Sequence, residues 1–179
     1  MTVRIIDSAQ PGDIPALVDL VAATFPLACP PGTDPADIAD HISKQLNQEQ
    51  ISLWQSQPSF DLLVARGDDR LAGYILLDHQ PLEETPAVAH WLTIAPRSEL
   101  SKCYVDPAFH GQSVAQALMS AAGAVARHRG SLALWLGVNQ LNARAIRFYR
   151  RCGFSIVGPR VFTVGCQSHH DFIMEWSLV

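Results

Sequence analysis

Apolar residues recur at helical or strand spacing along most of the chain, and this pattern predicts a succession of regular elements. In the first half, Asp13 can cap a helix that has Pro15 in its first turn. Gly67-Asp68-Asp69-Arg70 separates two apolar runs, which is typical of a β-hairpin. The elements expected here are a strand at Val3–Ile6, helices at Ile14–Thr24, from Thr33 or Asp34 to about Gln48 and at Ile51–Gln57, and strands at Phe60–Arg66 and Leu71–Leu77.

The second half alternates strands and helices after a loop-like stretch, residues 79–98, in which Ala87–Ile94 holds some regular structure. Leu132–Val138 is a nearly continuous apolar run, as expected for a strand buried on both faces. The elements expected are strands at Glu99–Val105, Leu132–Val138, Phe154–Val161 and Phe172–Leu178, and helices from about Gly111 to Gly130 and over Asn142–Arg151. This order, without a repeat or linker, predicts one mixed α/β domain over residues 1–179.

Composition narrows the class of protein. With 48% hydrophobic and 17% charged residues, the chain suits a globular protein with its own core. No apolar run is long enough for a bilayer and Met1–Asp7 is no signal peptide, so we expect a cytoplasmic protein. The four cysteines and the pair His169-His170 lack ligand spacing, which predicts packed free thiols and no metal site.

Charge divides unevenly between the two halves of the chain. Residues 1–90 carry 13 acidic and 4 basic side chains, whereas residues 91–179 carry 4 acidic and 9 basic ones. An anionic ligand bound by the basic half and a cationic substrate near the acidic half would suit this asymmetry, although solvated surface charge explains it as well. Because the chain is acidic and its basic half lacks interleaved aromatic residues, a nucleic-acid role has little support.

The segment His110–Ala115 is the strongest candidate for a site. It is rich in small residues, follows a strand end and a Pro107 turn, and leads directly into an apolar-periodic helix. A loop that enters a helix in this way directs unpaired backbone N–H groups and the positive end of the helix dipole to one point. Such a point favours phosphate.

Two enzyme classes fit this loop poorly. Gly111-Gln112-Ser113-Val114-Ala115 is close to the nucleophile elbow of α/β-hydrolases, but that elbow joins strand to helix directly, and here Asp106 to His110 intervene. A Rossmann dinucleotide site needs G-x-G-x-x-G and an acidic residue about 20 residues further on, and the chain has neither.

The segment Val105–Met119 (V-D-P-A-F-H-G-Q-S-V-A-Q-A-L-M) resembles the acetyl-coenzyme A loop of the GCN5-related N-acetyltransferases (GNAT), Q/R-x-x-G-x-G/A after a V-x-P strand end. Leu136–Phe154 resembles the second signature of that family, L-x-V-x-x-x-N-x-x-A-x-x-F-Y-x-K/R-x-G-F. His110 stands where Gln or Arg is usual, and Ser113 where Gly is usual; the Ser113 hydroxyl could donate to a phosphate oxygen instead. The resemblance implies a mixed twisted sheet of about six or seven strands, splayed at its centre around the cofactor, with about four helices.

The resemblance also implies an acetyltransferase that uses acetyl-CoA as cosubstrate. Tyr149 matches the tyrosine that usually protonates the departing thiolate; a helix aromatic can also simply pack on the core, but the intact motif favours the general acid. Glu99 lies on the strand where some members hold a general base, and strand alternation predicts that it shares a face with Ser101, Cys103 and Val105. Asn142 matches a residue near the pantetheine arm and can also cap its helix. The cofactor residues implied are Cys103, Tyr104, Val105, His110, Gly111, Gln112, Ser113, Val114, Ala115 and Asn142.

The resemblance implies that the acceptor is an amine that attacks the thioester directly; polyamines, arylalkylamines, amino acids and a protein N-terminus all stay open as acceptors. F-x-x-G at Phe162–Gly165 and D-x-x-M at Asp171–Met174 resemble the tail of the bacterial branch that includes spermidine/spermine acetyltransferases, which favours a polyamine over a protein N-terminus. The non-enzymatic alternative is an acyl-CoA-binding sensor or interaction domain. A homodimer is the common default for the assembly.

Overall fold

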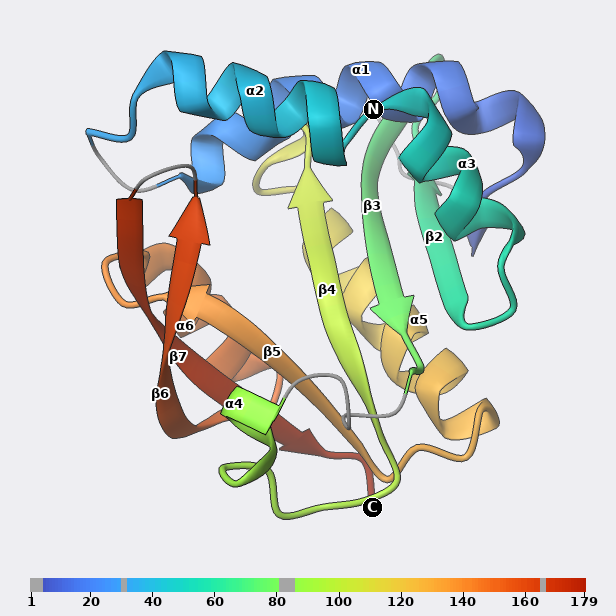
Figure 1. Ribbon diagram of the computed structural model, residues 1–179. Helices are drawn as coiled ribbons and strands as arrows, with labels where there is room; N and C mark the ends of the chain where they lie inside the picture. Colours follow the sequence, from blue (N-terminus) through green and yellow to red (C-terminus); the bar gives the residue numbers. More distant parts are fainter. Residues whose placement is uncertain (1–4, 30–31, 81–85, 165–166) are drawn as a thin grey trace.

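The computed structural model describes residues 5–29, 32–80, 86–164 and 167–179 (Figure 1). Its strands are β1 (Ile5–Ser8), β2 (Phe60–Arg66), β3 (Leu71–Asp78), β4 (Arg97–Val105), β5 (Ala133–Asn139), β6 (Ser155–Val164) and β7 (Gln167–Ser177). Its α-helices are α1 (Ile14–Thr24), α2 (Pro35–Gln45), α3 (Gln48–Ser56), α4 (Pro86–Ala89), α5 (Val114–His128) and α6 (Ala143–Arg151). Short 3-10 turns are η1 (Pro11–Asp13), η2 (Phe25–Ala28) and η4 (Pro107–Phe109).

The seven described strands form one mixed sheet in the order β1-β2-β3-β4-β5-β7-β6. All neighbours are antiparallel except β4 and β5, which are parallel. Their ladder joins only Arg97–Glu99 to Ala133–Trp135, although β4 continues to Val105 and β5 to Asn139. Beyond Glu99 the two strands diverge, and Figure 1 shows the sheet opened into a V between them. The predicted mixed sheet with splayed central strands is confirmed.

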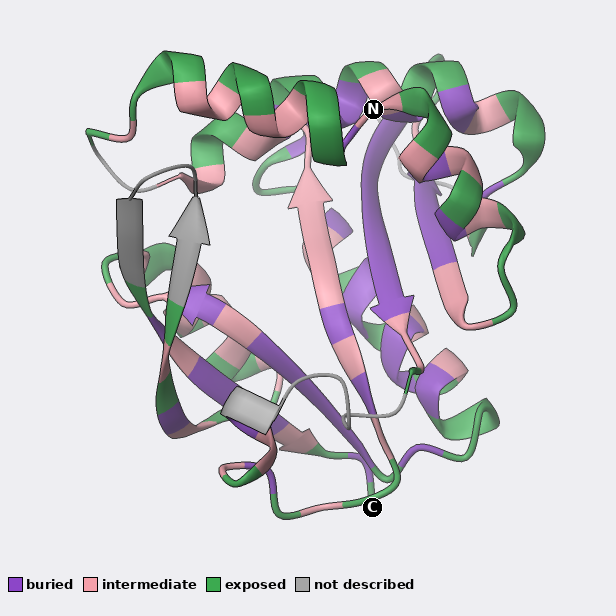
Figure 2. Ribbon diagram, in the orientation of Figure 1, coloured by how far each residue is buried: buried purple, intermediate pink, exposed green. Residues whose placement is uncertain are grey.

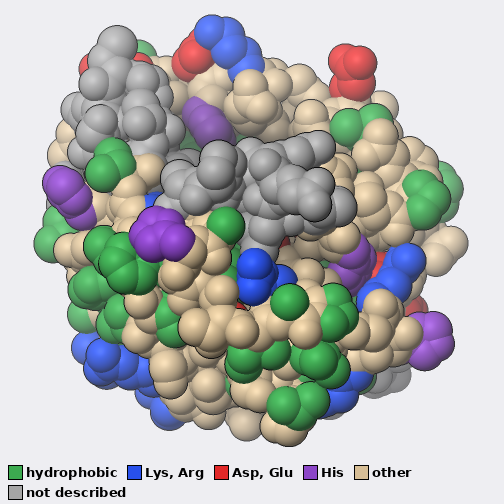
Figure 3. Space-filling model, turned by 60° about the horizontal axis from the view of Figure 1, so that its bottom comes forward, with side chains coloured by type: hydrophobic (Ala, Val, Ile, Leu, Met, Phe, Trp, Pro, Cys, Tyr) green, Lys and Arg blue, Asp and Glu red, His purple; other side chains and the backbone are tan. Residues whose placement is uncertain are grey.

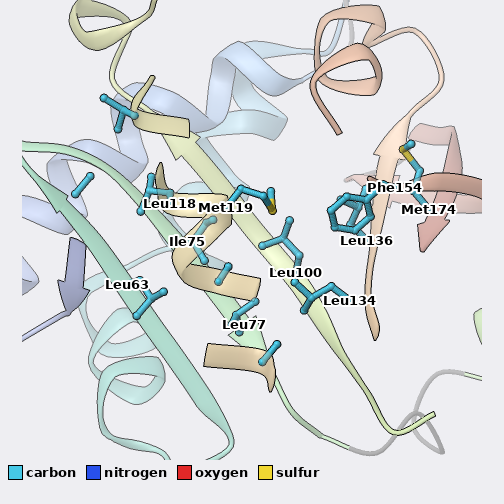
Figure 4. Close-up of a cluster of buried hydrophobic side chains, with 14 of the residues drawn as sticks. Leu63, Ile75, Leu77, Leu100, Leu118, Met119, Leu134, Leu136, Phe154 and Met174 are labelled. Carbon is cyan, nitrogen blue, oxygen red and sulfur yellow. The ribbon is translucent and has the colours of Figure 1, made fainter. Parts of the chain in front are cut away.

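Helices cover both faces of the sheet. In Figure 1, α1, α2 and α3 lie in front of its upper part, whereas α5 and α6 lie behind it. Alternate residues of β3 belong to different cores: Ile75 and Leu77 pack with Leu118 and Met119 of α5, whereas Tyr74 packs with the α1 and α3 side chains. Figure 4 shows the cluster on the α5 side. β3 is buried along nearly all of its length, whereas β4 is only partly buried (Figure 2). The difference arises because β4 borders the V.

A network of polar side chains connects the strands at the closed end of the V, where β4 and β5 still pair. Arg129, just after α5, donates two hydrogen bonds to Asp61 of β2 at 2.8 and 3.0 Å. His79 Nε2 lies 3.0 Å from the Asp61 carboxylate, and His79 Nδ1 lies 2.6 Å from the Ser98 hydroxyl of β4. The Ser98 hydroxyl in turn lies 2.6 Å from the Ser131 hydroxyl, just before β5. One chain of hydrogen bonds therefore links β2, β3, β4 and the start of β5.

Most predicted elements are present with small shifts in their ends. α1 and β2 have the predicted bounds, and the strand predicted from Val3 is described from Ile5, because residues 1–4 lie outside the described part. α3 begins at Gln48 rather than at Ile51, since the Asn47 side chain accepts a hydrogen bond from the Gln50 N–H at 2.9 Å and caps the helix there.

The greatest difference from the predicted elements is at the C-terminus. The last two strands form a longer hairpin than predicted, β6 paired with β7 from Ser155–Glu175 to Val164–Gln167. The sequence did not predict that the last strand begins at Gln167, because the polar run Gln167–His170 has no alternation of apolar and polar residues. Among the described residues, no helix is long and apolar enough to cross a membrane.

Candidate active site

A cavity of about 1030 Å³ occupies the V between β4 and β5. Its walls come from the end of α1 with η2, from α2, from β4, from the loop before α5, from β5 and from α6. Arg160 of β6 and Asp171 of β7 complete the lining. One cavity therefore includes the N-terminus of α5, both diverging strands and residues of the N-terminal helices.

The loop between β4 and α5 is fixed at its start. The Asp106 side chain accepts a hydrogen bond from the Ala108 N–H at 2.8 Å, and Phe109 is fully buried. Gly111 (φ 79°) and Ser113 (φ 61°) then adopt left-handed backbone conformations, so that α5 begins at Val114 rather than near Gly111 as predicted. A left-handed serine costs about 1 kcal/mol relative to glycine there, which explains why glycine is usual at this position.

The N-terminus of α5 has the donors that an anion needs. The first hydrogen bond within the helix runs from the Ala117 N–H to the Ser113 carbonyl at 3.0 Å, so the N–H groups of Val114, Ala115 and Gln116 precede it. Among the described residues, the Ser113 side chain makes no capping hydrogen bond. Val114, Ala115 and Gln116 line the cavity, and a helix N-terminus that faces a cavity in this way favours an anion such as phosphate.

Two loop side chains are turned back onto the loop. His110 Nε2 lies 3.1 Å from the Val105 carbonyl, and Gln112 donates to the Ala108 carbonyl at 3.1 Å. His110 lines the cavity with Gly111, Ser113, Val114 and Ala115, whereas the predicted residue Gln112 is not part of the lining. Gln116, which the motif did not indicate, takes part in it.

A bulge in β4 changes which of its side chains share one face of the strand. The register shifts so that Leu76 pairs with Lys102 but Leu77 with Leu100, which leaves Ser101 as the extra residue. Leu100 therefore packs in the same core as Cys103 and Val105, toward α5. The predicted common face of Glu99 with Cys103 and Val105 is wrong, because the extra residue reverses the alternation.

Glu99 lies on the opposite face of β4, together with Lys102 and Tyr104. Its parallel partner is Trp135, and the Lys102 ammonium lies 4.9 Å from the Trp54 ring on the α3 side. Burial raises the pKa of the Glu99 carboxyl, and Asp78 raises it further, while Arg160 and Lys102 oppose the shift. A carboxyl poised in this way in a cavity is suited to accept a proton near neutral pH.

Tyr149 of α6 lines the cavity. Its ring packs edge-on against Phe154 at 5.7 Å between centroids and tilted against Phe148 at 5.4 Å. Burial raises the pKa of its phenol well above the ordinary value, so the group stays protonated at neutral pH. The residue is both a packed aromatic and part of the lining, and the two roles proposed for it from the sequence are compatible.

Asn142 also combines two roles. Its side chain accepts a hydrogen bond from the Ala145 N–H at 3.0 Å, which caps α6, and the residue lines the cavity beside Tyr149. The cavity thiols are packed rather than reactive. Burial raises the pKa of Cys103 to about 12, with Cys152 adding to the effect, and burial likewise raises the pKa of Cys152.

Several residues that line the cavity were not indicated by the sequence. Arg160 of β6 lies against Gly137 of β5, where an added Cβ would meet its guanidinium, and it donates to Asp171 at 3.4 Å. Phe25 stacks on His41 at 4.8 Å with an interplanar angle of 9°. These residues come from distant parts of the chain, and only the strand register and the helix packing bring them together.

A molecule bound in the cavity would be affected more by the charged groups that line the cavity than by the charge on the outer surface of the protein. On the face shown in Figure 3, the Lys and Arg side chains of the described residues lie in several separate places. The residues of the N-terminal half that line the cavity include no carboxylate, lysine or arginine; they are Thr24, Phe25, Leu27, Ala28, Cys29 and His41. The acidic residues of that half, as far as the structure describes them, lie outside the lining. In the described ranges no group of three or more His, Cys, Asp or Glu side chains could hold a metal ion.

A sheet opened between two parallel strands, with a helix N-terminus, a phenol and a carboxyl lining the opening, is typical of an acyltransferase that uses a phosphate-bearing acyl donor. Residues 16–154 match the model of the acetyltransferase (GNAT) family. The chain belongs to this family, whose members use acetyl-CoA as the acetyl donor.

Individual relatives agree with this assignment. The chain is 38% identical over 167 residues to the uncharacterised N-acetyltransferase Rv2669 of Mycobacterium tuberculosis, covering 93% of this chain and 99% of that protein. It is 24% identical over 167 residues to an uncharacterised N-acetyltransferase of Lactobacillus delbrueckii subsp. lactis, with 93% of each chain covered. Its fold matches PaiA N-acetyltransferase from Thermoplasma acidophilum, solved in complex with coenzyme A, with a TM-score of 0.76 at 22% identity over 97% of this chain and 98% of that one. These relatives support an enzyme over a non-catalytic binding domain.

Proposed function

We propose that this acetyltransferase moves the acetyl group of acetyl-CoA to the primary amine of a small molecule, by direct attack of the amine on the thioester. The observation that carries the proposal is the continuity of the cavity, which runs from the N-terminus of α5 past Tyr149 to Glu99. A thioester held in the V would have a phosphate site on one side and a proton acceptor on the other.

The donor would bind along β4 and the following loop. The pyrophosphate would lie at the N–H groups of Gly111 and Ser113–Ala115, where the helix dipole favours negative charge. The pantetheine arm would lie in the V and pair with the backbone of Cys103–Val105, since β5 has diverged there and no longer takes those hydrogen bonds. Asn142 stands beside this path.

Transfer requires three proton movements. Glu99, whose raised pKa suits it as a base, would take the first proton from the acceptor ammonium directly or through water. The amine nitrogen then attacks the thioester carbon, the new C–N bond forms, and the C–S bond breaks. Tyr149, which burial keeps protonated, would give its phenolic proton to the departing thiolate. The nitrogen, positively charged after the attack, would lose its second proton, which restores the Tyr149 phenol through solvent.

The test is release of coenzyme A thiol from acetyl-CoA over a panel of amines. The panel includes spermidine, which the C-terminal sequence pattern favours, free amino acids and a peptide with a free N-terminus. Tyr149→Phe should lower kcat by about 10²-fold or more. Stabilisation against heat by acetyl-CoA should remain, because the phenol contributes little to binding the donor.

Tyr74→Phe is the matched control. Tyr74 is a buried tyrosine on β3, and its hydroxyl has no hydrogen-bond partner among the described residues. Its removal should leave turnover unchanged and should not destabilise the fold, because no hydrogen bond is lost. If Tyr149→Phe turned over as fast as Tyr74→Phe, Tyr149 would not be the general acid.

A further inference from the structure

We call the part of the cavity lined by Glu99 and Lys102 its acceptor end, and these two residues place one carboxylate and one ammonium on the same face of β4. The bulge at Ser101 brings Glu99 and Lys102 to this face, and both side chains line the cavity. Without the extra residue, positions three apart in a strand would point to opposite faces. The two charges are thus presented together to whatever molecule occupies this pocket.

Lys102 has an incomplete set of partners. Its ammonium faces the Trp54 ring at 4.9 Å, and among the described residues no carboxylate oxygen lies within ion-pair distance of it. Burial lowers the pKa of this ammonium, although Glu99 and Asp78 act in the opposite direction. A partly desolvated cation of this kind gains most from a bound anion.

The rest of the pocket does not suit a polycation. The wall that η2 and α2 contribute is apolar or aromatic and includes Phe25 stacked on His41. Burial lowers the pKa of His41, as does the neighbouring Lys102 charge, so His41 is neutral at physiological pH. A second cation, Arg160, lies across β5 at the same end. An acceptor with several ammonium groups would meet two cations, Lys102 and Arg160, and two carboxylates, Glu99 and Asp171, of which Asp171 already pairs with Arg160 at 3.4 Å.

We propose that the acceptor carries an anionic group close to its amine, and that Lys102 is the residue that selects it. The amine would lie at Glu99, the anion at Lys102, and an apolar substituent against the Phe25 wall. An amino acid with an apolar side chain is the simplest molecule of this kind. This inference rests on the proposed function, because it concerns the acceptor pocket of the same enzyme.

A matched substrate series tests the anion separately from the amine. Leucine, leucinamide, 3-methylbutylamine and the aminophosphonate analogue of leucine share one side chain, and the same set can be made for phenylalanine. We expect kcat/KM for leucine to exceed that for leucinamide by about 10- to 100-fold, the usual effect of a hydrogen bond to a charged group. A phosphonate preferred over the carboxylate would identify the anion as phosphate-like and still support an anion site.

The substitution Lys102→Met should bring the ratio of kcat/KM for leucine to leucinamide close to one, and Lys102→Arg should restore part of it. Lys44→Met is the control, because Lys44 is the other lysine of the chain and pairs on the surface of α2 with Asp40 at 2.7 Å. This control should leave the ratio as in the unaltered enzyme. Thermal unfolding with and without acetyl-CoA establishes that each variant is folded.

Three results would overturn the inference. Spermidine or leucinamide could prove the better substrate of the unaltered enzyme. Lys102→Met could lower kcat/KM equally for acid and amide, which would assign Lys102 to control of the Glu99 charge. Absence of turnover on every amine, with acetyl-CoA still bound, would refute the proposed function together with the acceptor class, whereas turnover without preference for the acid would refute the acceptor class alone.

Discussion

Replacing Asp61 by Asn should weaken the closed end of the V and make that loss depend on pH. Burial tends to raise the pKa of the Asp61 carboxyl, but hydrogen bonds from His79 and Arg129 outweigh it and lower the pKa from 3.8 to about 2. A shift of this size corresponds to about 2 kcal/mol of stability. The Asp61 side chain is 19% exposed but that of Arg129 is 39% exposed, so solvent screening reduces the expected loss to about 1–2 kcal/mol.

The sign of the pH dependence follows from the depressed pKa. The carboxylate contributes fully above the unfolded-state pKa, and its contribution disappears as the pH falls toward the folded-state value of about 2. The stability difference between the native chain and Asp61→Asn should therefore be constant from pH 8 to about pH 5 and shrink below about pH 4. At pH 7 the variant should melt about 2–8 °C lower.

Urea unfolding followed by circular dichroism at several pH values measures this difference. Asp69→Asn is the control for loss of one negative charge, because Asp69 is exposed in the β2–β3 turn. The KM for acetyl-CoA should stay the same in Asp61→Asn, because the network lies at the end of the V away from the loop before α5. A difference that persisted undiminished at pH 3, or no difference at pH 7, would refute the role of the charged network.

Two further predictions concern the site. Glu99→Gln should lower kcat/KM by about 10²-fold or more and remove the acid limb of its pH profile, which should lie above the ordinary glutamate pKa because burial raises it. The variant should also unfold at a higher temperature near pH 8, because a buried carboxyl with a raised pKa destabilises the fold once it ionises; an unchanged pH profile would show that Glu99 is not the base. Ser113→Ala should raise the KM for acetyl-CoA by about 10-fold or more, the effect of one hydrogen bond to a charged phosphate, and leave the melting temperature unchanged since the side chain caps nothing. An unaltered KM would mean that the hydroxyl does not reach the phosphate.

The donor side of the site was predictable because its residues are close together in the sequence. Gly111, Ser113 and the start of α5 lie within one turn of each other, and Asn142 and Tyr149 belong to one short helix. Local spacing is enough to define a helix N-terminus and one face of a helix. The same locality explains why α1 and β2 have the predicted bounds.

The acceptor side was less predictable because it depends on long-range register. A one-residue bulge opposite Leu76 and Leu77 decides that Glu99 shares a face with Lys102, and apolar alternation alone gives the other answer. Arg160 reaches the cavity only because β7 inserts between β5 and β6 and because Gly137 leaves room for its guanidinium. No spacing within either segment indicates that contact.

Charge summed over half of the chain says little about the lining of the cavity. The acidic excess of residues 1–90 suits a cationic acceptor, yet the residues of that half that line the cavity include no carboxylate. Charges on outer helix faces are solvated and screened within about 10 Å, whereas those inside a cavity act at short range in a lower dielectric. We therefore expect the choice of acceptor to depend on four charged groups of the lining, Glu99, Lys102, Arg160 and Asp171, rather than on the charge of the helices that cover them. An enzyme with this lining should select its substrate by the arrangement of opposite charges within one small molecule rather than by the total positive charge of that molecule.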